Sequence, residues 1–239
     1  MRPFFHICLL FLSAGLLIHC NEVKQVILPH TELIFPMEEG HYRISEVWDT
    51  TFTTAGINDP MVDHYFKKEV LAAQDTDLIG RPIRLVEVYR SEADLGTNYD
   101  FQIDRVWYQY LEPVEGADYY AERVVENVRT QVLKFPVIEG VRWNGNLQNN
   151  LGSEIFFYDK ADSTVSVQSQ MFENCVVVFQ NADSLNVINR RLAYEAYAPE
   201  IGLVKKLDRT LVFDGPGGGD AAFNPDKSRI YREELIEHN

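Results

Sequence analysis

Histidine is the side chain that most often transfers protons or binds metals near neutral pH, and four of the six histidines lie beyond residue 20. His30 falls in a segment with the character of a linker, and His238 is the penultimate residue. His41 and His64 are therefore the candidates for acid–base or metal chemistry. Both fall on strand faces that the pattern predicts to be solvated, so we predict no metal site and no cofactor.

Carboxylates are abundant, and three pairs of aspartates could ligate calcium through their oxygen atoms. The pairs are Asp75 with Asp77, Asp159 with Asp162, and Asp214 with Asp220. None has the regular spacing of a calcium-binding loop, so we expect solvated turns. The sequence has no nucleophile elbow, zinc-protease helix, dithiol pair, phosphate loop or dinucleotide fingerprint. We predict that the protein is not an enzyme, with a hydrolase that uses paired carboxylates as an open alternative.

An aromatic cluster is the feature that most favours ligand binding. Trp107, Tyr108 and Tyr110 place rings on both faces of one predicted strand, and Tyr119 and Tyr120 follow in the next. One face must join the core, while the other could offer a stacking surface to a sugar, a peptide or an acyl chain. The alternative is that both faces are covered, because Tyr and Trp are also favoured in strands. We take these five residues as candidate ligand-binding residues.

The elements that must position these side chains have the pattern of short β-strands. In residues 201–213 the odd positions are mainly apolar and the even positions mainly polar, which is the period of a strand. Further strands are predicted at 41–53, 83–90, 101–111, 119–125, 130–135, 154–158, 175–179 and 190–198, with turn residues between them. The sequence therefore predicts a mainly β fold, a curved antiparallel sheet that is half-barrel or sandwich-like, with at most one or two short helices.

Two segments fit a helix and a strand equally well. Between residues 59 and 71, apolar side chains recur at three- and four-residue intervals behind an Asp59 N-cap and Pro60, but they also alternate. Residues 229–238 are ambiguous in the same way.

Residues 32–239 are predicted to form a single β-rich domain. Residues 35–40 (FPMEEG) are echoed by residues 135–140 (FPVIEG), and each motif precedes a predicted strand. The echo suggests two sheet halves, 32–134 and 135–239, entered through the same turn; chance recurrence is the alternative.

The first 19 residues have the plan of a secretory signal peptide. Arg2 precedes an apolar run of 15 residues, 4–18, which is shorter than the roughly 20 residues that span a bilayer. The run ends at Leu17-Ile18-His19-Cys20, which resembles a bacterial lipobox, although His19 stands where a small residue is usual. We predict lipidation at Cys20 and a tether over residues 20–31. Cleavage near residues 13–15 is the alternative.

The net charge excludes one class of partner, and the cysteine content agrees with an envelope location. The net charge of −14 repels phosphate backbones, so nucleic acid is excluded as a partner. With Cys8 in the leader and Cys20 lipidated, Cys175 has no partner for an intramolecular disulfide. It lies in an apolar run, and we expect it in the core.

The leader, residues 135–146 (FPVIEGVRWNGN) and residues 194–205 (YEAYAPEIGLVK) resemble a group of lipoproteins of the Bacteroidota. The resemblance implies a curved antiparallel β fold, a strand at 61–71, and a membrane-anchored envelope lipoprotein of the outer membrane, on its periplasmic or surface side. It implies no activity, cofactor or catalytic residue. We predict that the protein binds a partner protein or an apolar or glycan ligand. A structural or accessory subunit of an envelope assembly is the alternative.

Overall fold

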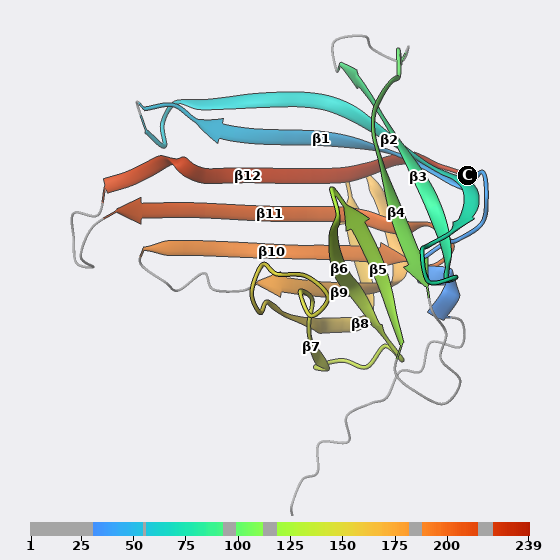
Figure 1. Cartoon of the computed structure of the whole chain (residues 1–239). Coiled ribbons are helices and arrows are strands. Elements are labelled where there is room, and N and C mark those ends of the chain that lie inside the picture. The colour runs from blue at the N-terminus through green and yellow to red at the C-terminus, as the bar shows by residue number, and fades with distance from the viewer. Residues whose placement is uncertain (1–30, 55, 93–98, 112–118, 182–187, 215–221) are drawn as a thin grey trace, which may run out of the picture.

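The protein is a single curved β-sheet with a 3-10 turn at its start (Figure 1). The computed structural model describes residues 31–54, 56–92, 99–111, 119–181, 188–214 and 222–239. The elements are η1 (Thr31–Ile34), β1 (Tyr42–Phe52), β2 (Pro60–Thr76), β3 (Pro82–Glu92), β4 (Gln102–Leu111), β5 (Tyr119–Val125), β6 (Val128–Phe135), β7 (Arg142–Asn144), β8 (Ile155–Val167), β9 (Gln170–Asn181), β10 (Asn189–Ala198), β11 (Gly202–Asp214) and β12 (Ala222–His238).

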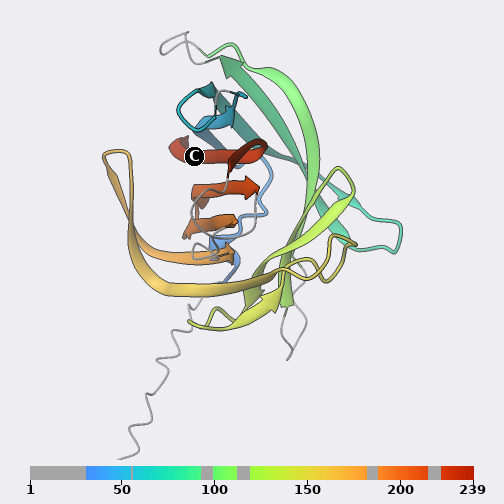
Figure 2. The same cartoon turned by 90° about the vertical axis from the view of Figure 1, so that its left-hand side faces the viewer.

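The twelve strands form an antiparallel meander in which β12 also pairs with β1. The sheet order runs from β6 through β1 and β12 to β7, so the first six and the last six strands form two consecutive runs. The sheet curls until its two ends approach each other, as a nearly closed barrel (Figure 2). The predicted fold class is confirmed. No helix among the described residues has the length and apolar character needed to cross a membrane.

The two ends of the sheet meet through a few specific hydrogen bonds. The Gln131 amide of β6 donates to the Gly145 carbonyl oxygen just after β7 over 2.8 Å. The Trp143 indole Nε1–H of β7 donates to the Gln131 carbonyl oxygen, also over 2.8 Å. The Tyr158 hydroxyl accepts from the Lys134 amide over 2.9 Å and donates to the Lys134 carbonyl oxygen. Side chains thus form hydrogen bonds with backbone groups on the β6 edge. Without these bonds, the unpaired edge could pair with a strand of another chain.

Both ambiguous segments are strands. Residues 60–76 form β2, which pairs with β1 along residues 60–70 and with β3 along residues 65–76. Asp59 does not cap a helix; its carboxylate instead accepts a hydrogen bond from the Thr53 hydroxyl across the β1–β2 turn. Residues 229–238 belong to β12. Ladder pairing on both sides outweighs the local helical signal in each case.

The echoed motifs form equivalent turns. The His41 amide donates to the Glu38 carbonyl oxygen and the Val141 amide to the Ile138 carbonyl oxygen, so each motif closes a four-residue turn. Gly40 and Gly140 have φ of 83° and 81°, in the left-handed region that glycine adopts without strain. Each turn leads into the first strand of a six-strand run.

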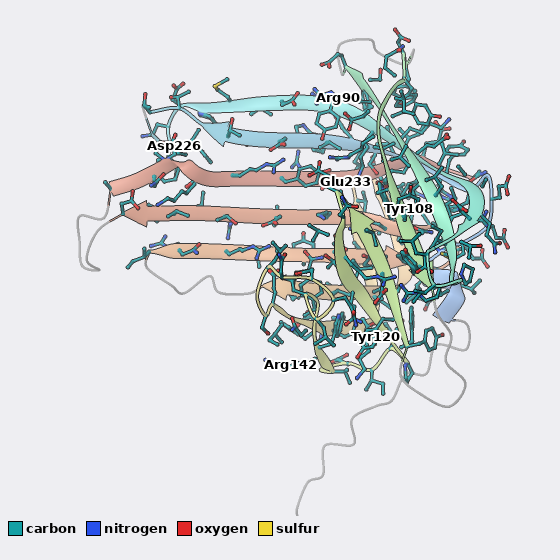
Figure 3. All side chains as sticks on the ribbon, viewed as in Figure 1. Arg90, Tyr108, Tyr120, Arg142, Asp226 and Glu233 are labelled. Carbon is teal, nitrogen blue, oxygen red and sulfur yellow. The ribbon has the colours of Figure 1, made fainter. Side chains whose placement is uncertain are left out.

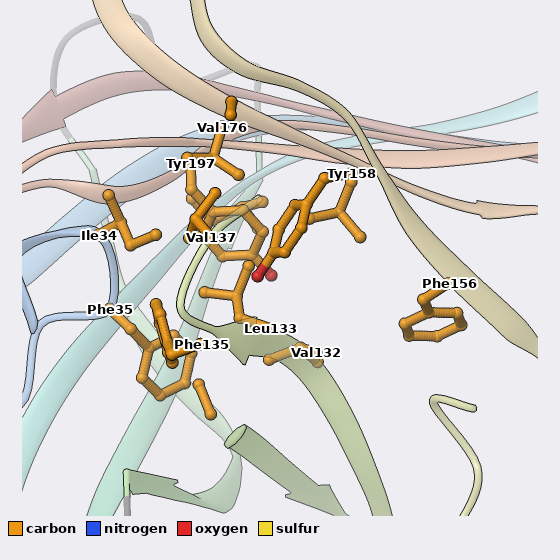
Figure 4. Packing of buried hydrophobic residues seen from close by; sticks show 14 of the residues in the cluster. Ile34, Phe35, Val132, Leu133, Phe135, Val137, Phe156, Tyr158, Val176 and Tyr197 are labelled. Carbon is orange, nitrogen blue, oxygen red and sulfur yellow. The ribbon is translucent and has the colours of Figure 1, made fainter. Parts of the chain in front are cut away.

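The main apolar core occupies the region where β6, β8 and the 3-10 turn meet (Figure 4). Phe135, Tyr158 and Tyr197 are fully buried there, beside Ile34 from η1 and Trp143 from β7. Each large side chain buried in this way contributes roughly 1.5–3 kcal/mol to folding. A smaller apolar cluster lies on β2–β4 and consists of Leu71, Val86, Val88 and Trp107.

Candidate ligand-binding site in the barrel interior

A cavity of about 350 Å³ lies inside the barrel, between the wall of β1, β11 and β12 and the wall of β2, β4 and β5. Figure 1 shows β3–β6 crossing in front of β9–β12, and Figure 3 places Glu233 on β12 at this crossing. Six basic side chains line the cavity: Arg43, Lys67, Arg105, Arg123, Lys206 and Arg229. Three acidic side chains also line it: Glu69, Asp208 and Glu233.

Strand alternation directs these charges inward. In β2, Tyr65, Lys67, Glu69 and Leu71 are buried, while the residues between them are more exposed. Because side chains alternate between the two faces of a strand, the buried set lies on the inner face. Cross-strand register then places Arg43 opposite Glu69 and Lys206 opposite Glu233, so neighbouring strands contribute opposite charges.

A first ion-pair network joins β1, β2 and β12. The Lys67 ammonium lies 2.6 Å from Glu233 Oε2 and 3.3 Å from Glu69 Oε1, and Arg43 pairs with Glu69. The Tyr231 hydroxyl donates to Glu233 Oε2 over 2.9 Å. The two buried carboxylates thus converge on one lysine.

A second network spans the cavity from β5 to β10 and β11. Glu195 is fully buried, and its Oε1 lies 3.1 Å from Arg123 Nη1 and 2.8 Å from Lys206 Nζ. The Tyr197 hydroxyl donates to Glu195 Oε2. The Arg123 guanidinium lies 5.4 Å from the centre of the Trp107 ring. Opposite walls are therefore tied by a buried charge pair.

These networks fix the protonation states. Burial raises the pKa of Glu69, but the nearby Arg43 and Lys67 charges outweigh burial and hold the pKa below its usual range. Burial opposes the ionised form of Glu195 as well, and the Arg123 and Lys206 charges again keep its pKa low. Burial and the adjacent carboxylate Glu195 raise the pKa of Tyr197. At neutral pH the two carboxylates are therefore ionised and the phenol is protonated.

The five aromatic candidates are distributed over both faces of the sheet. Trp107 is buried and lines the cavity. Tyr108 is 38% exposed, and alternation places it on the opposite face (Figure 3). Tyr110 is buried on that same face, with the Arg129 guanidinium 4.2 Å from its ring centre. Tyr119 stacks on a core phenylalanine and Tyr120 packs against the main core. The structure thus brings Trp107 alone of the five to the cavity, and ligand binding by the other four stays a prediction.

Sequence reasoning missed the charged cavity because it took the apolar positions of residues 201–213 as a single odd-numbered face. A register shift between β10 and β11 falls at Leu203 and Lys205. Beyond it the even positions Lys206, Asp208 and Thr210 line the cavity. Leu207 lies on the outer, half-buried face. One sequence signal could have predicted the charged cavity. In β2, Lys67 and Glu69 are two positions apart and so point to the same face of the strand, while the residues between and around them on the other face include apolar side chains.

The two candidate histidines contact neighbouring strands and turns. His41 is half-buried, which lowers its pKa, and its Nε2 lies 3.2 Å from the Ile201 carbonyl oxygen. His64 contacts Glu46 and stacks on Trp48. Among the described residues, no group of three or more His, Cys, Asp or Glu side chains is placed to hold a metal ion.

Cys175 is fully buried, and burial raises the pKa of its thiol to about 11, so its expected place in the core is confirmed. The second predicted cysteine site, Cys20, lies outside the described residues, as do Asp220 and the predicted signal peptide.

No protein-family profile matches the chain, and no curated protein sequence matches it. Among solved structures, the chain is similar to the crystal structure of a candidate lipoprotein from Parabacteroides distasonis, a member of the Bacteroidota. The two share 9% sequence identity with a TM-score of 0.38, over 87% of this chain and 98% of that chain. A likeness of this size assigns neither a family nor a function.

Proposed function

We propose that the protein is a lipid-anchored protein of the bacterial cell envelope that binds a small polar ligand inside its barrel without transforming it. The cavity of about 350 Å³, with its lining of charged side chains, carries the ligand-binding part of the proposal. Small-molecule sites are concave, largely pre-formed and about 300–1,000 Å³ in volume. Because the ion pairs hold the side chains in place before a ligand arrives, less conformational entropy is lost on binding.

The chemistry of the lining favours a polar ligand over an apolar one. An apolar molecule in the cavity would remove water from Lys67, Glu69 and Arg123 without offering hydrogen bonds in return, which is unfavourable. A glycan or another hydroxylated metabolite can replace that water with its own hydrogen bonds. The ring of Trp107 gives such a ligand an apolar face to lie against.

The leader supports the envelope anchor. Residues 1–19 have the order of a signal peptide and Cys20 closes a lipobox-like motif. Beyond the predicted tether, Ile34 and Phe35 are buried in the main core. A lipid on Cys20 would hold the barrel within a short tether of the membrane surface.

A hydrolase is the second candidate, because Glu69 and Glu233 are both buried in the cavity and share Lys67. Glycoside hydrolysis by two carboxylates needs one of them protonated as the general acid. The pKa of Glu69 lies below its usual range, so this residue is ionised and fits only the base or nucleophile role. Mass spectrometry of a bound ligand after long incubation distinguishes the candidates, since cleavage products appear only with a hydrolase.

Blocking the cavity tests the proposal directly. Val125 lines the cavity, whereas Val106 is 42% exposed on the neighbouring strand and does not line it. The full chain is extracted from the envelope in detergent and screened by thermal shift against polar metabolites and glycans. We expect ligands that stabilise the wild type and Val106→Trp to lose their effect on Val125→Trp.

Two results would overturn the proposal. One is a screen in which no polar small molecule stabilises the wild type; a stable complex cross-linked in the native envelope would then favour the accessory-subunit alternative. The other is an equal ligand effect on both tryptophan variants, which would place binding outside the cavity.

A further inference from the structure

The charges inside the barrel do not balance. Four cations, Arg43, Lys67, Arg123 and Lys206, share three buried carboxylates, Glu69, Glu195 and Glu233. These seven groups leave one positive charge over, although the whole chain carries a net charge of −14. An unbalanced charge in a region shielded from water is unfavourable until a counter-charge arrives.

The other charged residues of the lining do not remove this surplus. Arg229 pairs with Asp49, and Arg191 is shared by Asp208 and Glu154, so the charge of Asp208 is only partly neutralised. Arg105 lies 3.6 Å from Asp104, beyond hydrogen-bond distance, and both side chains are nearly half exposed. The Arg105 guanidinium is therefore a weakly paired cation of the cavity, and it offsets the remaining negative charge of Asp208, so the surplus of one positive charge persists.

Among the described residues, several buried polar atoms of the cavity lining also lack a hydrogen-bond partner. Within the part of the chain that the structure describes, Arg43 Nε and Arg123 Nε have no acceptor, and Glu233 Oε1 has no donor. A buried polar atom without a partner costs roughly 1–3 kcal/mol relative to the same atom paired. The cavity thus offers N–H donors from two strands and one carboxylate acceptor on β12.

We propose that the cavity recognises a small polar molecule with one oxyanion group, a carboxylate or a phosphate, next to hydroxyl groups. This inference rests on the proposed function and names the ligand class. The oxyanion supplies the missing negative charge among Arg43, Arg105 and Arg123. A neighbouring hydroxyl donates to Glu233, and the ring of Trp107 lies against the carbon skeleton.

Three matched sugars test the proposal by titration calorimetry on the detergent-extracted full chain. Glucose is neutral, glucuronate carries a carboxylate and glucose 1-phosphate carries a phosphate. We expect at least one anion to bind about tenfold more tightly than glucose, because charge-assisted hydrogen bonds are roughly twice as strong as neutral ones. The tighter of the two anions identifies the source of the oxyanion.

A pair of arginine variants locates the binding. Arg105→Gln removes a cavity charge whose ion pair is exposed, so it leaves the fold intact. Arg190→Gln removes an exposed arginine that does not line the cavity. We expect Arg105→Gln to weaken binding of the preferred anion about fivefold or more and Arg190→Gln to change it less than twofold, with unchanged thermal midpoints for both variants.

The outcomes separate this inference from the proposed function. Equal affinity for glucose and both anions overturns the inference and leaves the proposed function standing. The same holds if none of the three sugars binds while another neutral ligand is blocked by Val125→Trp. Equal effects of the two arginine variants place the anion outside the cavity and overturn the inference.

Discussion

At the scale of single residues, Glu195 is the most constrained group in the molecule. It is fully buried, and its carboxylate balances Arg123 and Lys206. Glu195→Gln keeps the shape but leaves two cations without their shared counter-charge, so we expect a loss of about 3 kcal/mol in the free energy of unfolding. Urea denaturation at pH 7 measures this loss of unfolding free energy. Glu92→Gln, at a 68% exposed carboxylate, is the matched control and should cost less than about 1 kcal/mol. Equal losses would contradict the assignment.

The same residue predicts a pH dependence. Because the folded state holds the pKa of Glu195 below its usual range, its contribution to stability is full above the unfolded pKa and is lost as pH falls through the folded pKa. The unfolded pKa is about 4.3. We therefore expect the difference in unfolding free energy between wild type and Glu195→Gln to be constant from about pH 8 to 5 and to shrink below about pH 4. A difference that grows in acid would show that the carboxyl is protonated in the fold.

At the scale of elements, the weakest junction of the barrel is the approach of β6 to β7, where β7 has only three residues. The Trp143 indole donates across it to Gln131. Trp143→Phe removes this buried donor, and we expect a loss of about 2 kcal/mol and faster hydrogen exchange at the Gln131 amide. Trp48→Phe, on a half-exposed ring of β1, controls for the lost ring volume. Exchange at Gln131 that stays slow in Trp143→Phe would show that the junction does not depend on this bond.

The sequence predicted where most strands lie along the chain, but it did not predict which face of each strand points into the barrel. Alternation placed most strands, and turn residues placed their ends, because both are local properties of the chain. The face of β11 depends on a register shift near Leu203, which reverses the side to which the following residues point, until a second shift between Thr210 and Val212. The pairing of Arg123 with Glu195 joins residues 72 positions apart, so only the closed sheet brings them together. Local pattern therefore predicted the fold class but not the cavity.

At the scale of the whole molecule, the two charge distributions have opposite signs. The whole chain has a net charge of −14, while the buried ion-pair networks of the barrel carry one excess positive charge. An acidic exterior repels anionic lipid head groups and nucleic acids. An anionic ligand is held only where the local cations outnumber the carboxylates, so the exterior selects against non-specific anion binding while the interior retains a specific site.

The same acidic exterior requires a covalent anchor if the protein is to remain at a membrane. Cys20 is the predicted site, and two or three acyl chains, at about 0.8 kcal/mol per buried methylene, hold a domain almost permanently. Intact-mass spectrometry of the envelope-extracted protein should show the loss of residues 1–19 and a gain of acyl chains, both abolished by Cys20→Ala. Cys8→Ala, in the leader, should leave the mature mass unchanged. An unacylated product cut near residues 13–15 would instead leave the Cys20 thiol free and remove the membrane anchor from the proposed function.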